Sequence, residues 1–214
     1  MNIKVYCILF LVSFFVICGS NAQNLSKDLQ TVFDACQSIR MAIDAGNTSS
    51  LKAANKVLKH CGIRPFTSLY PIDSEPVSLN GHFVFDCTFI DSLITGRDVY
   101  KFAQRYAELN GVKGLSTSGK VCAKTCAVKS LSSAKFIFTA KGHQELAVVT
   151  EPGGLITLRI HDITHDIWCN DTVNVYKGQA SRIAIMNLPD ERSEIELNIM
   201  NRCNRDISFV VIGR

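Results

Sequence analysis

The densest group of chemically capable side chains lies between positions 161 and 171. The run His161-Asp162-Ile163-Thr164-His165-Asp166-Ile167-Trp168-Cys169-Asn170-Asp171 brings two imidazoles, three carboxylates and a thiol together. Such groups are zinc and calcium ligands, so a metal site or a small secreted hydrolase is one interpretation. In an extended strand, however, His161 and His165 are about 13 Å apart, at roughly 3.3 Å per residue, too far to share an ion. The sequence therefore favours a solvated loop and assigns no metal, cofactor or catalytic residue.

The same run contains the only tryptophan of the chain, Trp168. A tryptophan beside polar side chains is either a platform on which a ligand stacks or an anchor of the hydrophobic core. Both interpretations stay open. The candidate ligand-binding residues are His161, Asp162, His165, Asp166 and Trp168.

The chain has nine cysteines, of which Cys7 and Cys18 lie in its first 22 residues. An odd number, seven, remains, so at least one thiol is free, buried or intermolecular. Cys36 and Cys61 fall on the apolar stripes of two predicted helices. A disulfide between them is a hypothesis, and two packed thiols are the alternative.

The N-terminus has the pattern of a secretory signal peptide. Lys4 is followed by an apolar run from 5 to 17 and by small residues up to Ala22, which predicts cleavage near Ala22. Lipid anchoring at Cys18 is the weaker alternative, because bulky Ile17 precedes it. No later apolar run reaches membrane length, so we expect a secreted or periplasmic protein with no membrane span in the mature chain.

Hydrophobic spacing divides the rest of the chain into two parts. Residues 23–114 form a mainly helical N-terminal region: apolar residues three and four apart predict helices over 25–46 and 49–62, alternation predicts a strand over 83–89, and a third helix is expected over 98–109. Residues 115–214 carry short apolar or alternating runs separated by turn residues. The predicted strands are 120–128, 135–140, 145–150, 155–163, 172–176, 182–186, 194–200 and 207–212. The fold class is therefore α+β, with a helical hairpin, a third helix and a strand followed by an antiparallel β-sandwich.

Part of the sandwich resembles a known type of domain. The runs Phe136-Ile137-Phe138, Leu146-Ala147-Val148-Val149, 155–162, Ile199-Met200-Asn201 and 206–211 resemble the strands of pre-peptidase C-terminal (PPC) type β-sandwich domains, over about residues 132–214. Those domains are non-catalytic modules of secreted enzymes, and some bind polymeric substrates. Only a short helical region, and no catalytic domain, is expected before the sandwich here. The resemblance implies no particular binding residue in this sequence.

These patterns predict an exported, non-catalytic protein, a binding or structural accessory module. The expected partner is an envelope or secreted protein, or a glycan. Nucleic acid is excluded as a partner, because the formal net charge is only +4 and the basic residues are scattered. The alternative is a small secreted hydrolase or metal-binding protein that uses the loop from His161 to Asp171, which requires His161, His165 and Asp166 to converge.

Overall fold

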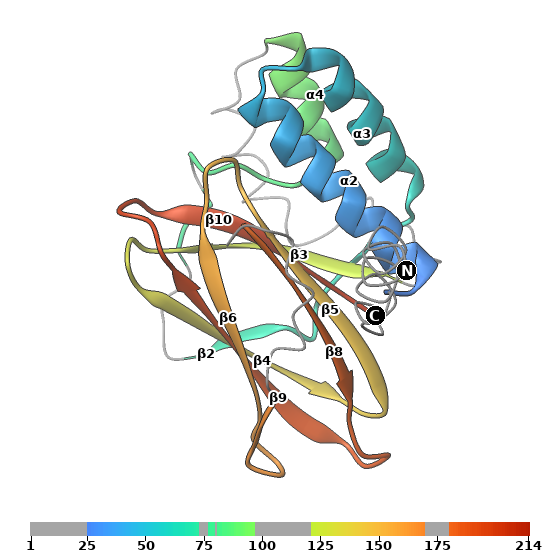
Figure 1. The fold of residues 1–214 in the computed structure, drawn as a ribbon, viewed down its shortest axis with the longest axis vertical. Helices are drawn as coiled ribbons and strands as arrows, with labels where there is room; N and C mark the ends of the chain where they lie inside the picture. The colour runs from blue at the N-terminus through green and yellow to red at the C-terminus, as the bar shows by residue number, and fades with distance from the viewer. Residues whose placement is uncertain (1–24, 73–76, 80, 97–120, 170–179) are drawn as a thin grey trace, which may run out of the picture.

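The structure, a computed structural model, describes residues 25–72, 77–79, 81–96, 121–169 and 180–214. In this part of the chain, helices pack against a sandwich of two β-sheets (Figure 1). The layers run in the order helices, first sheet, second sheet. The α+β fold class predicted from the sequence is confirmed.

The N-terminal helical hairpin consists of α2 (Lys27–Asp44) and α3 (Thr48–His60). Gly46, at φ +64°, ends the first helix, and Asn47 begins the second, because its side-chain oxygen accepts a hydrogen bond from the Ser50 backbone N–H at 3.0 Å. The buried side chains of α2 include Leu29, Phe33 and Ile39. The spacing of apolar residues therefore predicted both helices correctly.

The strand expected over 83–89 is wrong. A short helix, α4 (Cys87–Thr95), begins inside that range. Asp86 caps it by accepting hydrogen bonds from the backbone N–H groups of Thr88 at 2.8 Å and Phe89 at 3.1 Å. The alternating aromatic residues have the spacing of a strand, which led to the wrong prediction. In the structure, Phe83 packs edge-to-face against Phe85 and Phe89. The third helix expected over 98–109 lies outside the described residues.

Each sheet contains five strands. The first sheet has the order β1-β3-β10-β5-β8, and the second has the order β2-β4-β9-β6-β7. All neighbours are antiparallel except β1 and β3. The bounds of the first sheet are β1 (Arg64–Pro65), β3 (Cys122–Val128), β10 (Ile207–Gly213), β5 (His143–Thr150) and β8 (Ser181–Asn187). Those of the second are β2 (Tyr70–Ile72), β4 (Ser133–Ala140), β9 (Ser193–Asn201), β6 (Ile156–Asp162) and β7 (Ile167–Cys169).

Seven of the eight expected strands of the sandwich are thus present, and the one expected over 172–176 lies outside the described residues. Three strands were not expected. Two of these, β1 and β2, come from the N-terminal region and add one edge strand to each sheet. They are two and three residues long, too short to show a period.

The number of buried faces explains why the sequences of some strands are almost continuously apolar while those of others alternate between apolar and polar residues. Every residue of β10 is buried, because one face of the first sheet contacts the second sheet and the other contacts the helices. Strands β4, β6 and β9 bury every second residue, so the second sheet buries one face and leaves the other toward solvent. We call this solvent-facing side of the second sheet the outer face.

The disulfide expected between Cys36 and Cys61 is not formed in the structure, where both are free thiols. Cys36 is buried on the inner side of α2, while the Cys61 thiol donates a hydrogen bond to the Val57 carbonyl of its own helix at 3.2 Å. Burial raises the pKa of Cys36, and the neighbouring Cys61 and Cys87 thiols add to that rise. The structure thus records two free thiols, and the bridge stays a hypothesis.

Residues 1–22, with the expected signal peptide, Ala22 and Cys18, lie outside the described part of the chain. In the part that the structure describes, no helix combines the length and apolar character needed to cross a bilayer.

Candidate functional site

The polar run from His161 to Trp168 forms a β-hairpin rather than one extended segment. Strand β6 ends at Asp162, the chain turns, and β7 returns antiparallel so that Trp168 lies opposite His161. Asp166, in the turn, has a φ of +53°, a conformation that aspartate tolerates better than most residues. The solvated loop expected from the sequence is therefore only the short turn between these strands.

His161 and Trp168 form a stacked pair on the outer face. Their ring centroids are 4.4 Å apart and the ring planes differ by 9°. Asp166 Oδ1 lies 3.0 Å from His161 Nε2 and fixes the orientation of the imidazole from its far side. Trp168 is 53% exposed, and because one face of the indole lies against His161, the opposite face and the rim carry that exposure. A rigid, exposed aromatic surface results.

The second histidine belongs to a separate cluster. Asp162 is 2% exposed and accepts a hydrogen bond from the backbone N–H of His165 at 3.2 Å, and its Oδ2 lies 2.9 Å from His165 Nδ1. Burial alone raises the pKa of Asp162, but the hydrogen bonds from His165 and Ser193 outweigh it, and the net shift is downward. This aspartate therefore stays ionised and holds the turn to the end of β6.

The geometry of this cluster does not match a hydrolytic triad. A catalytic serine and its orienting carboxylate contact opposite nitrogens of the histidine. Here Ser193 Oγ lies 3.3 Å from His165 Nδ1, the same nitrogen that faces Asp162, and Ser193 is fully buried. The hydroxyl is thus neither activated through the ring nor open to a substrate.

The convergence required by the hydrolase or metal-binding alternative is also not found. His161 faces outward and pairs with Asp166, whereas His165 pairs with Asp162, whose side chain belongs to the buried set of β6. Within the described ranges, no group of three or more histidine, cysteine or acidic side chains is placed to hold a metal ion. The five sequence candidates thus form two histidine–aspartate pairs, with Trp168 stacked on the outer one.

Beyond the hairpin, a row of side chains continues across the whole outer face. The strand register places Trp168 beside His161, His161 beside Glu196, Glu196 beside Ile137, and Ile137 beside Tyr70. Side chains directly opposite on neighbouring strands point to the same side of a sheet. The row therefore begins and ends with an exposed aromatic residue, since Tyr70 is 64% exposed.

The neighbouring row carries hydrogen-bonding groups. Arg159 on β6 lies beside Asn198 on β9, which lies beside Lys135 on β4. Lys135 Nζ reaches diagonally to Glu196 Oε1 at 3.8 Å. The middle of the outer face thus presents a guanidinium, an amide, an ammonium and a carboxylate between its two aromatic edges.

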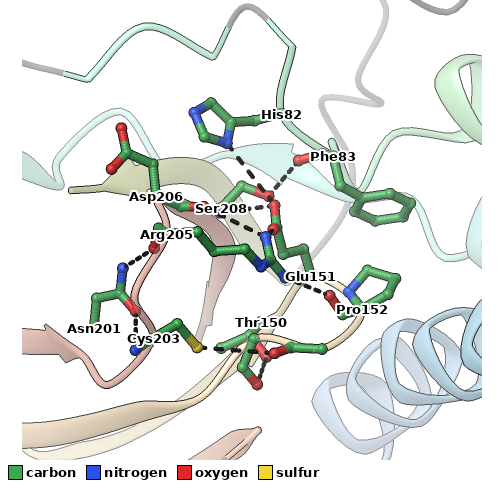
Figure 2. Close-up of polar contacts among 12 residues, drawn as sticks. His82, Phe83, Thr150, Glu151, Pro152, Asn201, Cys203, Arg205, Asp206 and Ser208 are labelled. Atoms are coloured by element: carbon green, nitrogen blue, oxygen red, sulfur yellow. Dashed lines mark hydrogen bonds and ion pairs between the residues drawn. The ribbon is translucent and has the colours of Figure 1, made fainter. Parts of the chain in front are cut away.

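A second polar cluster lies where the loop after β5 meets β10, and Figure 2 shows it in detail. Buried Glu151 forms an ion pair with Arg205, and its Oε2 accepts a hydrogen bond from the Ser208 backbone N–H at 2.9 Å. The Ser208 hydroxyl lies within hydrogen-bond distance of Glu151 Oε2 and of the Phe83 carbonyl oxygen, and His82 Nδ1 is 4.0 Å from Oε2.

The Glu151 cluster has the residue types of an active site without its geometry. Both carboxylate oxygens are already engaged, and the Ser208 hydroxyl contacts the carboxylate rather than the His82 imidazole, so the cluster does not have the serine–histidine–acid order of a catalytic triad. What the cluster does is join the segment before α4 to the sandwich through Phe83 and Ser208. We therefore assign it a structural role.

Sequence reasoning identified Trp168 and His161 but missed the other polar and aromatic residues of the two rows, which are Tyr70, Lys135, Arg159, Glu196 and Asn198. A signal was present for those on β4, β6 and β9, because they alternate with buried residues. Their meeting in two rows depends on the strand order β2-β4-β9-β6-β7, in which no two neighbours except β6 and β7 are adjacent in sequence. The spacing of apolar residues within each strand does not determine the order of the strands in the sheet.

The comparisons with known proteins place the chain near several solved structures only loosely. No model of a known protein family matches, and no curated protein matches by sequence. Two periplasmic inhibitors of g-type lysozyme, PliG of Salmonella Typhimurium and a mutant of that of Escherichia coli, each share 14% identity, cover 48% of this chain and 93% of their own, and superpose with a TM-score of 0.32. RmlC of Streptococcus suis, solved with dTDP-D-xylose, shares 7% identity over 52% of each chain, with a TM-score of 0.24. Likenesses of this size carry no argument about function.

Proposed function

We propose that this protein is an exported, non-catalytic binding protein that holds its partner on the outer face of the second sheet. The partner class is a secreted or envelope protein, or a glycan. The N-terminal segment, read as a signal peptide cleaved near Ala22, supports export to the periplasm or the cell exterior. The pattern of short apolar strands, which resembles that of PPC domains, supports the assignment as a non-catalytic module.

One observation carries the proposal. The helices cover the free side of the first sheet, and the two sheets bury each other's inner faces, while the outer face keeps a large aromatic ring exposed. Trp168 is held in place by His161, which is itself held by Asp166, so little conformational entropy is lost when a ligand contacts it. A rigid, exposed aromatic residue is the type of side chain on which binding energy concentrates.

The proposal is tested with Trp168 as its own reporter, because the chain has no other tryptophan. The mature protein is titrated with a panel of purified envelope and secreted proteins and with a panel of glycans, and tryptophan emission and acrylamide quenching are followed. A genuine ligand shields Trp168. Trp168→Ala, followed by calorimetry because this variant contains no tryptophan, should bind the same ligand at least about tenfold more weakly.

The matched control is Met41→Ala, which truncates an exposed apolar side chain on α2, on the other side of the molecule. It should leave binding unchanged. Ligands that bind with Trp168 still fully quenchable would contradict the proposed face, and turnover of any ligand would contradict the non-catalytic assignment.

A further inference from the structure

The distribution of charge over the outer face distinguishes a glycan from a protein partner. Protein interfaces concentrate aromatic residues at their centre, deplete charges there and place polar residues at the rim. Here the order is reversed: Trp168 and Tyr70 lie on the two edge strands, and the charged side chains lie on the central ones. Docking a protein on this face would desolvate Lys135 and Glu196 at its centre.

A glycan chain has the complementary chemistry. The C–H face of a sugar ring packs on the electron-rich face of an aromatic ring. Its hydroxyl groups act as both donors and acceptors, so they match a row of amide, guanidinium, ammonium and carboxylate groups. Asn198, Arg159 and Glu196 present these groups between the two aromatic edges.

The signs of the charges on the outer face indicate which class of glycan it can bind. The outer face and its turn carry three acidic residues, Glu194, Glu196 and Asp166. Against them stand three basic ones, Arg159, Lys135 and Arg202, whose guanidinium contacts Met200 of β9, with His161 beside them. A polyanionic glycan requires an excess of basic residues, as phosphate-binding surfaces do. The balance of acidic and basic groups on this face instead suits a neutral chain.

We infer that the outer face binds an extended, neutral oligosaccharide that runs across the strands from Trp168 to Tyr70. This inference rests on the proposed function and names its ligand class. The two aromatic residues are separated by four strand spacings, about 19 Å at roughly 4.8 Å per spacing. Only a chain of several sugar units contacts both, so affinity must grow with chain length.

The test measures binding of neutral glucan, xylan and chitin oligosaccharides, from mono- to hexasaccharide, to the full mature protein by calorimetry. At least one series should bind with affinity that rises with length. Trp168→Ala should weaken the hexasaccharide about tenfold, equivalent to ~1.4 kcal/mol. Tyr70→Ala should weaken the hexasaccharide and leave the short members that bind at Trp168 unchanged.

Two controls separate loss of contact from loss of fold. Met41→Ala should bind as the wild type does. Every variant should unfold in one cooperative transition, with a melting temperature that falls only slightly in Trp168→Ala, which also loses the stacked pair with His161. Glu196→Gln keeps the shape of the row and removes one acceptor charge, so it should weaken binding less than Trp168→Ala does.

The inference is overturned if affinity is independent of chain length, if Tyr70→Ala leaves the hexasaccharide unaffected, or if heparin binds more tightly than every neutral series. If no glycan binds but a protein ligand is lost in Trp168→Ala, the glycan class is wrong and the proposed function stands. If neither panel shields Trp168, both fail.

Discussion

Each histidine of the β6–β7 hairpin is bound to an aspartate, and that pairing decides what the hairpin can do. His161 is engaged by Asp166 on one side and by Trp168 on the other, while His165 is engaged by Asp162 through its Nδ1 atom. Side chains held in this way orient a surface. They do not converge on a substrate atom, a geometry that supports the proposed binding role over proton transfer.

The stacked pair gives a first prediction. His161→Ala should free the inner face of Trp168, so its emission shifts to longer wavelength and its quenching by acrylamide increases. The loss of a cross-strand pair should cost about 0.2–1 kcal/mol of the free energy of unfolding. Arg159→Ala, two residues earlier on the same face, is the matched control and should leave the emission unchanged. If both variants give the wild-type spectrum, Trp168 does not rest on His161.

The buried aspartate gives a second prediction. Asp162→Asn keeps the size of the side chain but removes the charge that His165 contacts, and it should lower the free energy of unfolding by about 1–3 kcal/mol. Asp166→Asn changes an aspartate whose side chain is 91% exposed and should cost less than about 0.5 kcal/mol. Urea denaturation of both variants measures the difference. Equal costs would mean that the inner pair does not hold the turn.

At the scale of elements, the spacing of apolar residues predicted strands and helices correctly where one face is buried. It gave a wrong prediction where a capping residue starts a helix. The strands β4, β6 and β9 alternate cleanly, and the helices of the hairpin carry apolar stripes. The segment 83–89 also alternates, yet Asp86 begins a helix inside it, because two capping hydrogen bonds outweigh a short apolar period. Strand β7 was missed because three residues show no period.

Strand β9 supports a third prediction, because it lies at the centre of the second sheet and has two unlike faces. Leu197 is fully buried, so Leu197→Asp places an unpaired charge in the core and should unfold the sandwich. Asn198→Asp introduces the same side chain one residue later, on the outer face, and should change stability by less than about 0.5 kcal/mol. Circular dichroism melting measures both. A Leu197→Asp protein that melts like the wild type would reverse the assignment of faces.

The helical layer supports a fourth prediction, on the thiols. Burial raises the pKa of Cys87 to about 11, and Cys36 is more deeply buried still, so both stay protonated near neutral pH and behave as small apolar side chains. Cys36→Ser should therefore lower the free energy of unfolding by about 1–3 kcal/mol, by the same amount with and without reductant. Urea denaturation in both buffers measures it. A loss confined to the non-reducing buffer would establish the Cys36–Cys61 bridge instead.

At the scale of the whole molecule, the layers could be predicted from the sequence only in part. The run of β10, apolar except for Ser208, indicates a strand covered on both faces, and the alternating strands indicate a sheet open on one side. What no local pattern contains is the joining of β1 and β2, from the N-terminal region, to the two sheets. That step also creates the far end of the outer-face row at Tyr70, so the sequence located one edge of the candidate site and not the other.

The charges that tie the layers together predict how stability depends on pH. Glu145 of β5 accepts a hydrogen bond from the Ser26 N–H before α2, at 2.9 Å, and lies 3.3 Å from His143 Nε2. Burial alone raises the pKa of Glu145, but these bonds outweigh it and the net shift is downward, as for Asp162. The pKa of His143 is raised, first by its contact with Asn187 and then by Glu145.

Carboxylates with a lowered folded pKa stabilise the protein fully above their ordinary values, 4.5 for Glu145 and 3.8 for Asp162, and lose that contribution as the pH falls further. The contribution of His143 is complete below 6.5 and is lost as the pH rises through its folded pKa. Stability should therefore be highest between about pH 5 and 6.5, with the steeper fall on the acid side, because His143 is largely exposed and contributes little. Urea denaturation from pH 3 to 8 measures the curve.

Glu145→Gln should flatten the acid limb, because it removes the acid. It should only reduce the alkaline limb, because His143 keeps its contact with Asn187. Asp162→Asn should flatten the acid limb alone, and exposed Asp190→Asn should leave both as they are. A Glu145→Gln curve that falls in acid as steeply as the wild type would mean that the contact between β5 and the start of α2 does not hold the helical layer to the sandwich.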